Sequence, residues 1–85
     1  MSDAFYRPLT RPATFQGRVS TNRADKGFEN YLNLRRGHYR MRVFLDGEEH
    51  QDVVTADPDT GTIKVYWGAQ TVTLKGYVEI KLERS

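Results

Sequence analysis

Arginines and a tyrosine crowd into one short stretch near the middle of the chain and carry its clearest chemical signal. Guanidinium groups bind phosphates or carboxylates, and an aromatic ring between them can stack on a base or anchor a protein contact. The same spacing also fits an exposed basic strand face with Tyr39 and the upstream Tyr31 turned into the core. Among the functional alternatives we place protein contact ahead of nucleic acid. The residues of this basic contact face are Arg35, Arg36, Tyr39, Arg40 and Arg42.

The remaining reactive side chains form no catalytic pattern. His38 and His50 are not at metal-ligand spacing, and we expect both to face solvent. The three serines lie in or near the termini without a triad pattern, and no glycine-rich phosphate loop occurs. Asp57-x-Asp59-x-Gly61 departs from a calcium loop in its spacing and fits a plain turn. We therefore expect a protein that is not an enzyme, with no metal or cofactor site.

The composition indicates one small intracellular domain with an uneven charge distribution. The 85 residues include no cysteine and no apolar run of membrane-spanning length. Residues 1–43 contain nine Lys/Arg and three Asp/Glu, a net charge of +6. Residues 44–85 contain four Lys/Arg and eight Asp/Glu, a net charge of −4. This asymmetry is typical of a polyanion partner or of an arm that docks on an acidic surface, and ordinary surface charge explains it equally well.

Residues 1–24 are predicted to be an extended N-terminal arm. Pro8 and Pro12 prevent a continuous helix, yet the segment carries more large apolar groups than a disordered tail usually holds. We expect these groups to be buried on their own domain or on a neighbour, and Ala13 to Val19 to add a short strand weakened at Gly17. The predicted partner-binding residues of the arm are Phe5, Tyr6, Arg7, Leu9, Arg11 and Phe15.

Residues 25–85 are predicted to form a small β domain. Asp25 to Arg36 fits a short helix with Asp25 as N-cap and Gly37 as its stop, although an irregular strand or loop fits nearly as well. Alternating apolar residues then predict a strand over Tyr39 to Leu45, and Asp46-Gly47 predicts a tight turn. The later strands are an edge strand or loop over Glu48 to Asp52, then Thr71 to Leu74 and Val78 to Leu82.

The strongest local prediction is a β-hairpin. Val53 to Ala56 and Ile63 to Trp67 are rich in β-formers and flank Asp57-Pro58-Asp59-Thr60-Gly61. Asp57 can accept backbone N–H bonds, Pro58 presets the turn, and Gly61 supplies the left-handed residue that closes it into a bulge. The whole pattern predicts a mainly β fold, an antiparallel barrel or sandwich of five or six strands. Its predicted core residues, with Trp67 the largest, are Met41, Val43, Val65, Trp67, Val78 and Ile80.

The C-terminal half resembles small proteins encoded among the structural genes of tailed bacteriophages. The resemblance rests on Val43-Phe44-Leu45-Asp46-Gly47-Glu48, on the hairpin from Ala56 to Tyr66, and on Leu74-Lys75-Gly76-Tyr77-Val78-Glu79-Ile80. It implies a phage protein without catalysis, in or near the head, present in the virion and in the host cytoplasm during assembly.

Together these features favour a virion structural protein. The expected partners are capsid or connector subunits, bound in many copies or as a homo-oligomer through the arm and the β domain, in the manner of a decoration or cement protein. The alternative is a small nucleic-acid-binding barrel that uses the basic contact face. No membrane partner is expected.

Overall fold

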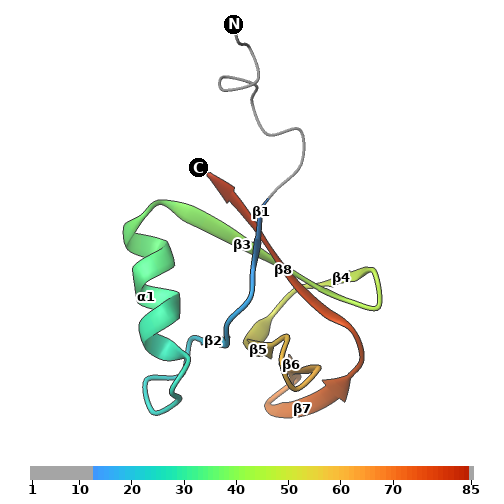
Figure 1. Cartoon of the computed structure of the whole chain (residues 1–85). Coiled ribbons are helices and arrows are strands. Elements are labelled where there is room, and N and C mark those ends of the chain that lie inside the picture. Colours follow the sequence, from blue (N-terminus) through green and yellow to red (C-terminus); the bar gives the residue numbers. More distant parts are fainter. Residues whose placement is uncertain (1–12, 85) are drawn as a thin grey trace, which may run out of the picture.

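A computed structural model describes residues 13–84 as two antiparallel sheets and one helix (Figure 1). The chain forms more strands than the five or six predicted, because two short strands precede the helix. In chain order the elements are β1 (Ala13–Phe15), β2 (Val19–Ser20), α1 (Phe28–Arg36), β3 (Tyr39–Leu45), β4 (Glu48–His50), β5 (Val53–Asp57), β6 (Thr62–Trp67), β7 (Gln70–Lys75) and β8 (Val78–Arg84).

The strands are divided between two sheets of four. The first sheet has the order β1-β8-β3-β4, and the second has the order β2-β5-β6-β7. Within residues 13–84 the sheets do not close into a barrel, so the sandwich alternative describes the fold. Successive strands β1 and β2 belong to different sheets, and the chain passes between them through residues 16–18. In place of the single short strand predicted over Ala13 to Val19, the chain forms two, which are separated by residues 16–18 around Gly17.

The predicted hairpin is confirmed. Strand β5 pairs antiparallel with β6, with Ala56 opposite Ile63. Gly61 has a φ of 68°, and its N–H donates to the carbonyl of Asp57 at 3.0 Å. The side chain of Asp57 also accepts from the N–H groups of Asp59 and Thr60, at 2.9 and 3.3 Å. The register shift that marks a bulge lies between Val53 and Thr55 rather than at the turn.

The core lies between the two sheets. The predicted residues Val43, Val65, Val78 and Ile80 are buried in it, and Met41 packs against it half-buried. Its other members include Leu45 from β3, Ala56 from β5, Ile63 from β6 and Val19 from β2. Because strand side chains alternate between faces, each of these positions is the inward-facing member of its strand.

The prediction that Trp67 fills the core is wrong, since this side chain is 74% exposed. Strand β6 pairs with β5 only from Thr62 to Val65, whereas its pairing with β7 continues to Trp67 opposite Gln70. The hairpin of β6 and β7 therefore extends two residues beyond β5. Trp67 keeps the facing of Ile63 and Val65 but lies past the end of the packed sandwich.

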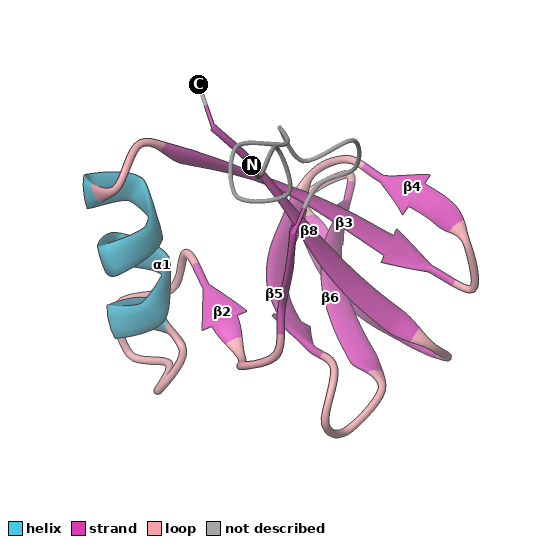
Figure 2. Cartoon of the chain, turned by 45° about the horizontal axis from the view of Figure 1, so that its top comes forward, coloured by secondary structure: helices cyan, strands magenta, loops and turns pink. Residues whose placement is uncertain are grey.

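Helix α1 starts later than predicted and lies at one side of the two sheets, beside β2 and the start of β3 (Figures 1 and 2). Gly27 is its N-cap, and Asp25 instead orders the preceding turn by accepting the N–H of Gly27 at 2.7 Å. At the other end Gly37 has a φ of −81°, and the left-handed residue is His38 with a φ of 64°. The helix packs on β2 and β3. No helix within residues 13–84 is long and apolar enough to cross a membrane.

Candidate functional site

Four of the five residues of the predicted basic contact face line one groove of about 520 Å³. The exception is Arg36, which is exposed on α1 outside the groove. Its sequence neighbour Arg35 does line it. The charged and aromatic residues of this groove come from two stretches of chain. Residues 31–43 contribute Tyr31, Arg35, His38, Tyr39, Arg40 and Arg42, and residues 49–52 contribute Glu49, His50 and Asp52.

The groove follows an uncovered edge of β3. Strand β8 pairs with β3 along its whole length, from Tyr39 to Leu45, whereas β4 pairs only with Val43 to Leu45. Asp52 has a left-handed φ of 55°, and beyond it the chain enters β5 in the other sheet. The first half of β3 is therefore left without a paired strand on the β4 side among the described residues, and α1 borders the groove there. Unpaired N–H and C=O groups on such an edge can pair with an added extended chain.

The lining of the groove is mixed and carries charges of both signs. Val19, Val43 and Ala56, which are core residues, are among the lining residues. The basic rim residues Arg35 and Arg40 are both exposed, and Asp52 is the exposed acidic group of the opposite stretch. The three core residues are almost fully buried, so most of the surface that the groove presents is polar. The groove is therefore suited to a ligand that presents polar and charged groups.

Arg42 also lines the groove, but its guanidinium is engaged within the first sheet. It donates to both carboxylate oxygens of Glu49, at 3.0 and 2.7 Å, and to Glu83 at 3.0 Å. These hydrogen bonds and charges raise the pKa of Arg42 above its ordinary value and lower the pKa of Glu49. The outer face of this sheet is therefore a mixed ion-pair network, not a bare basic strand face. Glu83 is 41 residues from Arg42, so the local pattern could not predict this contact, whereas Glu49 is seven residues away across the turn at Asp46-Gly47.

The two histidines, which the sequence did not connect, both line the groove. His38 is exposed and His50 is half-buried. Within residues 13–84 no three His, Cys, Asp or Glu side chains form a group that could hold a metal ion.

The arm predictions fall mostly outside the described residues, which begin at Ala13. This holds for Phe5, Tyr6, Arg7, Leu9 and Arg11. Phe15 lies in β1, and its half-buried side chain packs against the core of its own domain. Residues 13–20 supply one strand to each sheet, so this part of the segment is integrated with the β domain.

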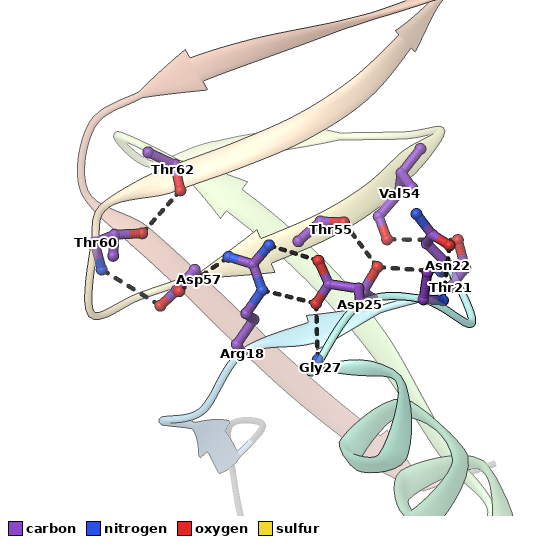
Figure 3. A network of polar contacts seen from close by, with 12 residues as sticks. Arg18, Thr21, Asn22, Asp25, Gly27, Val54, Thr55, Asp57, Thr60 and Thr62 are labelled. Atoms are coloured by element: carbon purple, nitrogen blue, oxygen red, sulfur yellow. Dashed lines mark hydrogen bonds and ion pairs between the residues drawn. The ribbon is translucent and has the colours of Figure 1, made fainter.

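An ion-pair network at Arg18 escaped the sequence interpretation altogether. Its guanidinium donates to both oxygens of Asp25, at 2.8 and 2.6 Å, and to Asp57 at 3.2 Å (Figure 3). The hydrogen bond from Arg18 is the main cause that lowers the pKa of Asp25 to about 2. Burial opposes ionisation of Asp57, but hydrogen bonds from Arg18, Thr60 and Asp59 outweigh it and lower its pKa. The network joins β2, the turn before α1 and the hairpin turn, so its role is structural.

Exposed aromatic residues form a second feature, away from the groove. Tyr66, Trp67 and Tyr77 are 56%, 74% and 68% exposed. The first two lie at the end of β6 beside the edge strand β7, and Tyr77 lies at the connection from β7 to β8. Exposed Trp and Tyr are typical of protein interfaces.

Comparison with known proteins gives no relative from which to transfer a function. No family model matches the chain, and no curated protein or solved structure matches it. The protein is therefore classified by its fold alone. The chain is an antiparallel β-sandwich domain with one helix and a groove at the uncovered half of β3.

Proposed function

We propose that this chain is a non-enzymatic virion structural protein of a tailed bacteriophage that binds an extended segment of a neighbouring capsid or connector subunit in the groove. The observation that carries the binding proposal is the uncovered half of β3 within that groove. A bound segment would continue the first sheet beyond β4 and hydrogen bond to β3, a common mode of peptide recognition. The assignment to a virion rests on the sequence resemblance alone.

Charge at the rim supports a protein partner over nucleic acid. Arg35 and Arg40 favour acidic groups, but Asp52 lies in the same groove and would repel a phosphate backbone. A peptide can present an acidic side chain to one stretch and a basic or neutral one to the other.

The experiment compares two adjacent arginines on α1. Arg35→Glu reverses a charge inside the groove, and Arg36→Glu makes the same change outside it. Phage carrying each substitution are purified, and copies of the protein per particle are counted by mass spectrometry. We expect Arg35→Glu to lower occupancy at least tenfold while Arg36→Glu leaves it near wild type. Equal occupancy of both variants would remove the groove from the function.

Two further measurements separate the components of the proposal. Absence of the wild-type protein from particles would overturn the virion assignment while leaving groove binding to be tested with isolated capsid and connector proteins. Binding of a labelled oligothymidine that weakens steeply with salt, and is lost in Arg35→Glu, would favour the nucleic-acid alternative.

A further inference from the structure

The longest exposed sheet edge is β7. The four edge strands of the two sheets are β1, β4, β2 and β7, and β7 has six residues where the others have two or three. It pairs with β6 over all six positions, and no described strand lies on its other side. It contains neither proline nor an acidic residue. Long, regular edges of this kind readily pair with another chain.

The turn before β7 determines which backbone groups face outward. Gly68 has a φ of 66° and Ala69 does not have a positive φ, which defines a two-residue type II′ hairpin loop. Trp67 and Gln70 then form a hydrogen-bonded pair, and the pairs alternate along the ladder. Counted from the turn, Val72 and Leu74 direct their N–H and C=O groups toward β6. Thr71, Thr73 and Lys75 direct theirs away from it.

The partner's chemistry follows from charge and side-chain facing. The edge of β4 carries Glu48 and Glu49, so two copies meeting there would bring like charges together. The only charge on β7 is Lys75, at its end. Val72 and Leu74 are half-buried against the core, and Thr71 and Thr73 are exposed on the opposite face. An added strand must match this alternation, and a second β7 running antiparallel does so.

We propose that two copies of the chain pair through β7, with Thr73 opposite Thr73 of the second copy. In this register the outward-directed N–H and C=O groups of Thr73 in one copy hydrogen bond to those of Thr73 in the other copy. It places Thr71 opposite Lys75, so neither lysine faces a like charge. It also places Val72 opposite Leu74, which extends the apolar inner face across the junction. The second sheets of the two copies then form one continuous sheet. This inference concerns a different edge from the groove and does not depend on the proposed function.

The test uses the absence of cysteine from the chain. Thr73→Cys, Thr71→Cys and Lys75→Cys are made singly in the full-length protein and treated with a short bismaleimide cross-linker. We expect Thr73→Cys to form covalent dimers at a rate at least tenfold higher than either of the other variants alone. A mixture of Thr71→Cys and Lys75→Cys should give the cross-linked heterodimer. Equal rates for all three single variants would overturn the register.

Sedimentation tests the pairing without a cross-link. Wild type and Thr73→Ala are expected to be dimers, whereas Thr73→Pro, which lacks the outward N–H, is expected to be a monomer. Circular dichroism tests whether each variant is folded. If Thr73→Pro does not fold, Thr73→Glu replaces it. A monomeric wild type would overturn the proposal. So would a wild type that dimerises only after residues 1–12 are deleted, because that segment would then be the occupant of the edge.

Discussion

The Nη1 atom of Arg18 lies 3.2 Å from Oδ2 of Asp57, although the two residues are 39 positions apart in the chain. The same guanidinium binds Asp25 at 2.6 Å. One side chain therefore fixes the start of β2 against the hairpin turn and the turn that leads into α1. The side chain of Asp57 is 9% exposed, so this carboxylate depends on Arg18 for its charge balance.

Replacing Arg18 by methionine should destabilise the domain by about 2 kcal/mol, because it leaves a buried carboxylate without its charged hydrogen-bond donor. Urea unfolding followed by circular dichroism measures the change. Arg23→Met is the matched control, since Arg23 is exposed and should cost less than about 0.5 kcal/mol. Similar losses in the two variants would show that the network does not stabilise the fold.

The same network predicts a stability that declines in acid. Asp25 has a pKa of about 2 in the folded protein against an ordinary value of 3.8, so the folded state binds this proton less readily than the unfolded state. Its contribution is complete above pH 3.8 and is lost as the pH falls toward 2. Unfolding free energies measured between pH 6 and pH 2 should therefore fall more steeply for wild type than for Arg18→Met. Parallel curves would contradict this linkage.

Gly61→Val should be more damaging than the same substitution at Gly47. Both glycines have a positive φ, so valine is strained at either position. A Cβ at Gly61 would in addition lie 2.7 Å from the carbonyl oxygen of Gly76, whereas a Cβ at Gly47 has nothing within 4 Å. We expect a difference of at least about 1 kcal/mol in unfolding free energy. Equal losses would mean that the turn moves to accept the side chain.

Trp67 should report an exposed environment. It is the only tryptophan, so the emission of the folded monomer is expected to lie close to that of the unfolded chain and to be quenched readily by acrylamide. Trp67→Ala should change the unfolding free energy by less than about 0.5 kcal/mol. Tyr66→Phe serves as a control on the same hairpin. A blue-shifted, protected emission in a monomeric sample would restore Trp67 to the core.

The sequence predicted the elements whose determinants are local. Strand β3 has the predicted bounds, and the hairpin of β5 and β6 has its turn and its left-handed Gly61 where expected. Trp67 was misplaced because alternation gives the face of a residue but not the length of the opposing sheet. The helix start was misplaced because Asp25 serves both the turn and Arg18.

The candidate site was predictable in its residue types but not in its arrangement. Arg35 and Arg40 stood out as a basic group, and the structure places both at the groove. The engagement of Arg42 by Glu49 depends on the register across the turn at Asp46-Gly47, and its engagement by Glu83 depends on a strand 41 residues away. The uncovered half of β3 depends on where β4 ends, which is set by the left-handed turn at Asp52. The contact with Glu83 and the end of β4 have no local signature.

The placement of β1 bears on how the domain is made in a cell. Ala13 lies opposite Leu82, so among the described strands the first to be synthesised pairs with the last. While the chain is still emerging from the ribosome, β1 has no partner, and β3 lacks the central neighbour that β8 later provides. Contacts between such distant segments also slow folding in general. The first sheet can therefore form only after β8 is released, and until then the nascent chain presents apolar strands that a chaperone or a neighbouring copy can capture.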